Sequence, residues 1–327
     1  MILLLLTLFK TSLGNELIYS DERVFYLAEI RSLYTQKNDN SSITLSLRSG
    51  LLSPPDTFYL SIDRAIITLK YRGFDGFLGR ETVSWGYGLF YSPFSYARSY
   101  ASPFDSELLK SGQNIAGINY QNIRFMTPEL IVFLPRRSIE RDSVMVGIRS
   151  NFFFSNLEFH TPLVYAADTI FIGFGFRFSL FYFTLFLDYS LSYTDTEIKN
   201  SAVTGFNRNI GSNLFIQAEY FYNQKGLNSE EYDNSSTEFL TRNLNLGYTG
   251  RHYIYSIAQW TFMTENTISF YSLIHPLWKS GLLGASVSSS RFENTLIMLN
   301  LVKILEGREF EYVPARNFYS LEFRYYF

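Results

Sequence analysis

The sequence contains no cysteine. This absence excludes disulfide bonds, thiolate metal sites and a cysteine nucleophile. The three histidines, His160, His252 and His275, lie far apart, and neither an HExxH motif nor another close metal-ligand spacing is present. We therefore expect neither a metal nor another cofactor.

The chain also lacks an excess of charge of either sign. Its 28 Lys and Arg residues nearly balance its 30 Asp and Glu residues, which leaves a formal net charge of −2. Proteins that bind nucleic acid do so largely through basic side chains that neutralise phosphates. A G-x-G-x-x-G phosphate loop is missing as well. Nucleic acid is therefore not an expected partner.

Long apolar runs are absent after the N-terminus, although a membrane-spanning helix needs about 20 consecutive apolar residues. Aromatic residues are abundant, with 32 Phe, 25 Tyr and 3 Trp. The mean hydropathy is nevertheless close to zero, at −0.02. Many aromatic residues with modest hydropathy are typical of strands that face lipid on one side and water on the other.

The N-terminus resembles an export signal. Residues 2–9 form a short apolar run, and Ser12 and Gly14 are small residues at the positions that a signal peptidase reads. We expect a signal peptide over residues 1–14, with cleavage before Asn15, and a single domain over residues 15–327. No basic residue precedes the run and Lys10 follows it, so a buried N-terminal strand or helix is the alternative.

Residues 179–193 alternate between apolar and polar side chains, which predicts a two-sided strand. The apolar face consists of Phe181, Phe183, Leu185, Leu187, Tyr189, Leu191 and Tyr193. Residues 170–178 and 214–223 repeat the arrangement, and the first of these stretches is expected to join residues 179–193 through a tight turn around Ser179. A soluble β-sandwich is the alternative, but its core favours Val, Ile and Leu over dense Phe and Tyr.

A charged side chain that faces hydrocarbon at mid-depth costs ~2–4 kcal/mol, so charged residues in these strands should face the lumen of a barrel. The inward candidates are Arg64, Lys70, Arg72, Arg80, Arg149, Arg177, Asp188, Glu219, Glu322 and Arg324. Basic candidates dominate the early strands. This favours a transverse electric field across the lumen and a mild preference for anionic or sugar-like solutes. A structural charge ladder in a narrow, plugged barrel is the alternative.

Polar, turn-like clusters at residues 36–42, 223–236 and 306–309 separate such strands. At roughly 20 residues per strand and turn, the chain predicts an all-β, transmembrane, antiparallel up-and-down β-barrel of about 16 strands, in a range of about 14 to 18. Residues 294–305 are apolar on both faces, so they fit either a strand or a short helix.

The C-terminal residues alternate in the same way, with Ser320, Glu322 and Arg324 on the polar face. The apolar face consists of Tyr319, Leu321, Phe323, Tyr325 and Phe327. This ending resembles the final strand of bacterial outer-membrane β-barrels. The resemblance implies that the barrel-assembly machinery reads these five side chains as an assembly signal. It also implies that the protein lies in the outer membrane of a diderm bacterium, in contact with its lipid and with lipopolysaccharide or an equivalent.

Residues 79–93 resemble a strand-turn-strand unit of porin-like and polysaccharide-export barrels, in which a Gly-Arg strand runs into a Trp-Gly-x-Gly turn and a Pro-bearing loop. The usual Asn-Pro-x-Asp ending is replaced here by residues 92–95, Ser-Pro-Phe-Ser. We expect Arg80 to face the lumen, Trp85 to lie near the lipid headgroups, and Glu81 to lie at the rim or in a bulge. Residues 87–112 form either a loop folded into the barrel or a plain extracellular loop.

These features predict a porin-like channel for passive passage of small polar, anionic or sugar-like solutes, and not an enzyme. The first alternative is a non-conducting surface barrel that serves as an adhesin, an antigen or an envelope-assembly partner. The second is an outer-membrane hydrolase. A hydrolase needs a Ser and a His, or paired acids and a His, at one rim, and the three histidines have no such partner at a diagnostic spacing.

Overall fold

In the computed structural model, the described residues form β-strands and the turns and short irregular segments that connect them. The structure describes residues 10–20, 24–53, 57–81, 83, 85–88, 92–94, 113–134, 144–166, 169–224, 226–227, 250–277, 280–292, 294–305 and 317–326. The strands are β1 (Lys10–Ser20), β2 (Val24–Lys37), β3 (Ser41–Ser53), β4 (Thr57–Tyr71), β5 (Phe74–Glu81), β6 (Gln113–Tyr120), β7 (Met126–Leu134), β8 (Met145–Phe154), β9 (Leu157–Ala166), β10 (Thr169–Leu180), β11 (Phe183–Tyr193), β12 (Ile198–Ile210), β13 (Leu214–Asn223), β14 (His252–Phe262), β15 (Asn266–His275), β16 (Ser280–Ser289), β17 (Thr295–Leu305) and β18 (Asn317–Tyr326). Among the described residues, no helix is long and apolar enough to cross a membrane.

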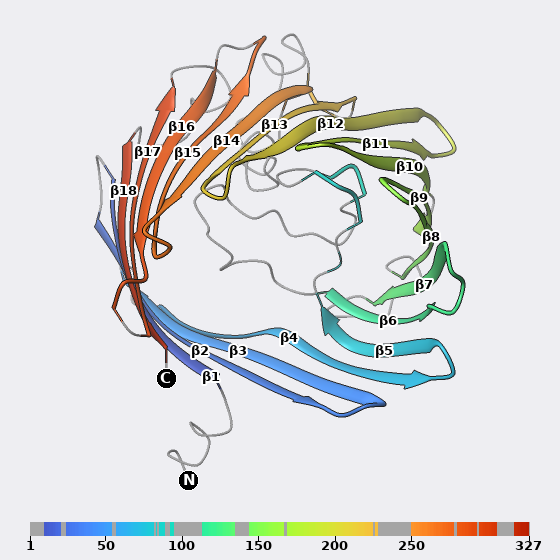
Figure 1. Ribbon diagram of the computed structural model, residues 1–327, viewed down its shortest axis with the longest axis horizontal. Coiled ribbons are helices and arrows are strands. Elements are labelled where there is room, and N and C mark those ends of the chain that lie inside the picture. The colour runs from blue at the N-terminus through green and yellow to red at the C-terminus, as the bar shows by residue number, and fades with distance from the viewer. Residues whose placement is uncertain are drawn as a thin grey trace.

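The strands form one antiparallel ring, drawn in Figure 1 around a central space. Each strand pairs with the strands before and after it in the chain, and β1 pairs with β18 from Ser12–Tyr326 to Ser20–Phe318. The prediction of an antiparallel up-and-down barrel is confirmed. The 18 strands stand at the upper limit of the expected range, because many turns are shorter than assumed.

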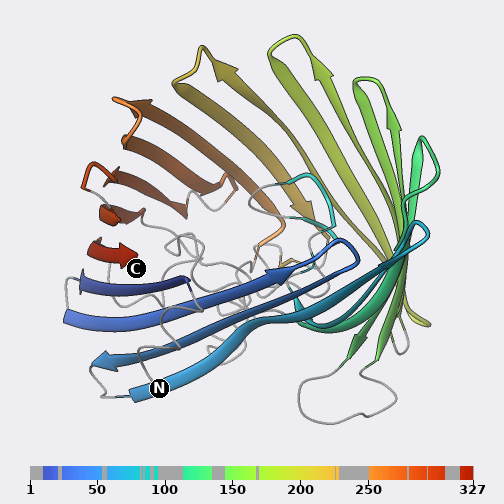
Figure 2. The same ribbon diagram turned by 60° about the horizontal axis from the view of Figure 1, so that its bottom comes forward.

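The two rims of the ring differ in the length of their connections. One rim carries the start of β1, the end of β18 and the short turns at residues 38–40, 72–73, 121–125, 155–156, 181–182, 211–213, 263–265 and 290–294. The opposite rim carries the four longest connections, at residues 82–112, 135–144, 224–251 and 306–316, together with five short ones. Figure 2 shows the strands slanting between the rims. Transmembrane barrels have this asymmetry, with short periplasmic turns and longer extracellular loops.

The short turns follow the conformational rules of β-hairpins. Arg72 and Gly73 have φ of 48° and 87°, as expected for a two-residue turn whose twist matches the flanking strands. The turn between β10 and β11 consists of Phe181 and Tyr182, and Phe181 has φ of 53°. The strand β10 therefore extends to Leu180, beyond Ser179, around which the turn was expected.

In the strands whose side chains the structure describes, these side chains alternate between the two faces as predicted. In β11, Leu185 is 46% exposed on the outer face, whereas Asp188 is fully buried on the inner face. A β-bulge shifts this alternation in β4, because Ser46 pairs with Arg64 while Leu47 pairs with Ile62. The apolar side chains before and after the bulge both remain exposed on the outside as a result.

Buried apolar side chains gather in two clusters on the inner face of the sheet. The first, cluster A, comprises Trp85, Phe94, Ile115, Ile131, Phe133 and Val164. The second, cluster B, comprises Phe186, Val203, Phe221, Tyr253, Tyr255, Leu273, Leu282 and Val302. The inner face is thus not uniformly polar. Part of the interior of the barrel is packed.

Candidate functional site: the lumen and its infolded segment

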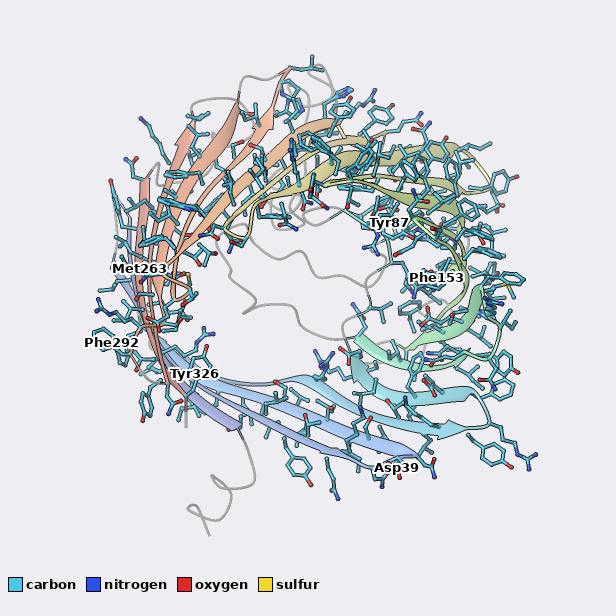
Figure 3. The ribbon with its side chains drawn as sticks, viewed as in Figure 1. Asp39, Tyr87, Phe153, Met263, Phe292 and Tyr326 are labelled. Atoms are coloured by element: carbon cyan, nitrogen blue, oxygen red, sulfur yellow. The ribbon has the colours of Figure 1, made fainter. Side chains whose placement is uncertain are left out.

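The chain turns into the ring directly after β5. We call residues 85–94 the infolded segment, of which the structure describes residues 85–88 and 92–94. Figure 3 shows the labelled Tyr87 inside the ring, whereas Phe153, Met263 and Phe292 lie at its periphery. Among the described residues of the stretch 87–112, the prediction of a loop folded into the barrel is confirmed.

Trp85 begins this segment and is only 2% exposed. Its indole packs in cluster A, edge-on to Phe133 at a centroid distance of 6.0 Å. The prediction that Trp85 lies near the lipid headgroups was wrong. It assumed that the strand alternation continued through residue 85, but β5 ends at Glu81 and the chain then leaves the sheet.

Asp188, on the inner face of β11, anchors the infolded segment. Its Oδ2 accepts hydrogen bonds from the backbone N–H groups of Tyr87 at 2.6 Å and Gly88 at 3.2 Å. Gly86 has φ of 107°, a backbone conformation that favours glycine and that directs the next two N–H groups toward one oxygen. The anchor therefore combines a buried carboxylate with a specific backbone turn.

His160 on β9 completes this contact. Its Nε2 lies 3.4 Å from Oδ1 of Asp188, and its ring packs against Tyr87 at 4.7 Å and edge-on against Phe94 at 5.2 Å between centroids. No spacing in the sequence links His160 to Asp188. The register of the sheet does, because Gly175 on β10 pairs with both residues.

Three inward glycines make room for this assembly. A Cβ atom on Gly147 would lie 2.5 Å from Cη2 of Trp85. A Cβ on Gly173 would collide with the ring of Phe94, and one on Gly175 would collide with both Asp188 and His160. These glycines lie within strands, where the residue is otherwise unfavourable. They are the signal from which a seat for an inserted segment could have been inferred.

Four of the predicted basic lumen residues form ion pairs with acidic residues on the neighbouring strand. Nη2 of Arg64 lies 2.6 Å from Glu81, Nζ of Lys70 lies 3.8 Å from Asp75, and Nη2 of Arg149 lies 2.7 Å from Glu129. The fourth pair is Arg177 with Glu158. These contacts fit a charge ladder, the alternative to a transverse field.

Two of these cations also contact the infolded segment. The guanidinium of Arg149 lies 5.3 Å from the ring centroid of Trp85, and that of Arg177 lies 5.2 Å from the ring centroid of Tyr87. Cation–π contacts of this kind are favourable and strengthen as they lose water. Burial raises the pKa of the Tyr87 phenol to about 12.

The remaining acidic candidates and Arg324 also lie on the inner face. Glu219 is buried and accepts a hydrogen bond from Nε2 of Gln217. Glu322 and Arg324 pair with each other along β18 and are both buried. These contacts, like the four ion pairs, are made between near neighbours on the sheet.

Arg72 and Arg80 do not lie where they were expected. Arg72 is in the β4–β5 turn, with its guanidinium 5.2 Å from the ring centroid of Tyr71. Arg80 pairs with Ala65 on β4 and Asn114 on β6, and paired residues lie on the same face of the sheet. The residues that follow them, Ile66 and Ile115, pack against or in cluster A on the inner face. Because successive residues of a strand face opposite sides, Arg80 is on the outer face. It lies one residue from the strand end, from which a long cationic side chain can reach water.

The predicted assembly signal lies on the outer face of β18. Tyr319, Leu321, Phe323 and Tyr325 are all exposed there, and Phe327 falls outside the described residues. Their outward position is compatible with contact to lipid or to another protein. Their recognition by assembly machinery stays a prediction.

The contact of His160 with Asp188 has the composition of part of a catalytic triad. Both side chains are buried, however, and the nearby Ser92 donates its hydroxyl to the carbonyl oxygen of Trp85. Within the part of the chain that the structure describes, no cluster of three or more His, Asp and Glu side chains could hold a metal ion. These groups hold the infolded segment in place and do not present a nucleophile to solvent.

Comparisons with known proteins support this fold. A mutant form of the porin from Rh. blastica superposes with a TM-score of 0.54 at 11% identity, covering 98% of this chain and 99% of that chain. OccK5 (OpdH) from Pseudomonas aeruginosa superposes with a TM-score of 0.65 at 8% identity, covering 98% and 96%. No family model and no curated protein sequence matches. The chain thus has the fold of a porin, a transmembrane antiparallel β-barrel.

Proposed function

We propose that the chain is a porin-like channel in the outer membrane of a diderm bacterium, through which small polar solutes pass passively. The rim with long connections faces the cell exterior, and the rim with short turns faces the periplasm. The observation that carries the proposal is the contrast between the two faces of the sheet. Exposed apolar side chains cover the outside, whereas ion pairs line part of the inside.

The infolded segment gives the channel its constriction. It is held on the inner face of β8 to β11 by the Asp188 anchor and by two cation–π contacts, and it fits there because Gly147, Gly173 and Gly175 leave room for its side chains and their partners. A segment fixed in this way reduces the cross-section and places Tyr87 and its partner Arg177 beside the passing solute. The walls then select by size, polarity and charge.

A non-conducting surface barrel is the second candidate. Clusters A and B favour it, because both bury large apolar side chains inside the ring and such packing could fill the interior. The two candidates differ in one measurable property. A channel conducts ions in a planar bilayer, and a filled barrel does not.

Purified, detergent-folded protein should therefore be added to a planar lipid bilayer. The proposal expects stepwise conductance, together with swelling of proteoliposomes in isotonic sugar solutions. Heat-modifiable migration on a gel confirms that the sample holds folded barrels. Folded protein without conductance would reject the channel and favour the non-conducting barrel.

We also propose a route by which the protein reaches its membrane. The peptide at residues 1–14 directs export, the aromatic face of β18 directs assembly, and the folded barrel contacts lipopolysaccharide or an equivalent. The strand β1 begins at Lys10, so cleavage before Asn15 removes its first five residues. The remaining part, residues 15–20, keeps its register with Phe318 to Phe323 on β18.

A further inference from the structure

Four cations on the described inner face each lie next to an acidic residue on the neighbouring strand: Arg64 next to Glu81, Lys70 next to Asp75, Arg149 next to Glu129 and Arg177 next to Glu158. A transverse field requires the opposite arrangement, with cations on one wall and anions on another. Adjacent opposite charges instead form short dipoles, whose potential decreases faster with distance than the potential of a single charge and is further screened by salt.

One of these pairs combines water exposure with contact to the constriction. The side chains of Arg177 and Glu158 are 43% and 30% exposed, whereas those of Arg149 and Glu129 are mostly buried. Arg177 also stacks on Tyr87 of the infolded segment. A solute that passes Tyr87 therefore meets Arg177 and Glu158 together.

The other acidic residues near Tyr87 do not add negative charge to the surface that a passing solute meets. Asp188 is fully buried beneath the infolded segment, and its Oδ2 is occupied by the N–H groups of Tyr87 and Gly88. Glu219 is buried and bonded to Gln217. Neither carboxylate is positioned to meet a solute in the water-filled part of the lumen.

We infer that the constriction is electrically balanced, with Arg177 and Glu158 as the pair that determines selectivity, and that its solutes are polar molecules without net charge, such as sugars or zwitterions. The inference rests on the proposed channel function and replaces the expected preference for anions. It follows from neutrality at the contact point, because a balanced pair neither attracts nor repels a free ion of either sign. Both members still offer hydrogen bonds to hydroxyl, ammonium or carboxylate groups.

The test uses two substitutions that keep the shape of the side chain or the polarity of the site but unbalance the pair. Glu158→Gln leaves the cation uncompensated, and Arg177→Gln leaves the anion uncompensated. The double variant restores neutrality. Arg208→Gln is the matched control, because Arg208 lies on the outer face with its guanidinium 4.4 Å from the ring centroid of Phe183.

Reversal potentials in a KCl gradient measure the ratio of cation to anion permeability. The wild type, the double variant and Arg208→Gln should all show a ratio near one. Glu158→Gln should lower the ratio and Arg177→Gln should raise it, each by roughly two- to fourfold, the size expected for one unit charge ~6 Å from a hydrated ion in ~0.1 M salt. All variants should keep heat-modifiable migration.

Two kinds of result would overturn the inference. A wild-type ratio far from one would show that the constriction is not balanced. Single variants that leave the ratio unchanged, or move it in the same direction, would show that this pair does not determine selectivity. Conductance is present in both cases, so the channel itself stands; folded barrels that never conduct would instead reject the proposed function, and the inference with it.

Discussion

Replacing Asp188 with alanine should weaken the docking of the infolded segment without unfolding the barrel. The carboxylate is the acceptor for two consecutive N–H groups of the segment, at 2.6 Å and 3.2 Å. The strand pairings of β11 with β10 and β12 run through backbone groups and do not depend on this side chain. The substitution therefore acts on the docking of the segment and leaves the ring intact.

The magnitude follows from the burial of the anchor. A hydrogen bond to a charged group contributes ~1.5–3 kcal/mol, so loss of both bonds weakens docking by ~3–6 kcal/mol. Burial of Trp85 and Phe94 contributes a similar amount, at ~1.5–3 kcal/mol for each large apolar side chain. The segment should thus remain mostly docked, while its undocked population rises by at least ~100-fold, since ~1.4 kcal/mol corresponds to a factor of ten.

Two assays report this change. Hydrogen exchange of the Tyr87 and Gly88 amides should accelerate in Asp188→Ala, and single-channel records should gain frequent transitions to a larger conductance. Asp188→Asn retains an acceptor oxygen and should show a much smaller effect. Ser192→Ala is the matched control, because Ser192 is on the same face of β11 but bonds to the carbonyl oxygen of Lys199.

Asp188→Ala protein that folds normally and keeps both wild-type exchange and wild-type conductance would contradict the anchoring role of Asp188. An equal effect of Ser192→Ala would contradict it as well. The first result would mean that aromatic packing alone holds the segment. The second would mean that any change on this face loosens it.

Three further predictions concern the inward glycine at residue 147, the outer face of β4 and the N-terminus. Gly147→Val should displace the Trp85 indole, because even a Cβ atom at residue 147 would lie 2.5 Å from Cη2 of Trp85. In a Trp260→Phe, Trp278→Phe background, the fluorescence emission of Trp85 should then shift to the red, and unchanged emission would contradict the prediction. Ile67→Arg on the outer face should lower the free energy of unfolding of the barrel in lipid by up to ~2–4 kcal/mol, as measured by chemical unfolding. Thr68→Arg on the inner face should lower it far less, and equal decreases for the two variants would argue against the assigned faces. N-terminal sequencing of exported protein should begin at Asn15, and any other start rejects the predicted cleavage site.

The alternating strands could be predicted because the face of each position follows from a local cost. A charge in hydrocarbon is expensive wherever it occurs in the chain, so Arg177, Asp188 and Glu219 could be assigned inward from their neighbours alone. Residues 294–305 were harder. Their inner face carries Val302 and Ile304, which are buried, so both faces of β17 are apolar and the alternation disappears.

The infolded segment could be predicted only in outline. The turn-like residues after β5 indicated either an inserted loop or an external one, but the anchor joins positions that are 101 residues apart. Periodicity is a local property and carries no information on such contacts. Trp85 was misplaced for the same reason, since local alternation cannot show where a strand ends and the chain turns inward.

The central claim is that alternate residues of each strand face lipid and water, and β4 offers the most direct test. Because the chain has no cysteine, a single cysteine substituted for Ile67, Thr68, Leu69 or Lys70 can carry the only spin label of the folded protein in lipid bilayers. Labels at Ile67 and Leu69 should be accessible to oxygen and not to a water-soluble nickel chelate, and labels at Thr68 and Lys70 should show the reverse. Accessibility that changes smoothly along the four positions, without a period of two, would contradict the account.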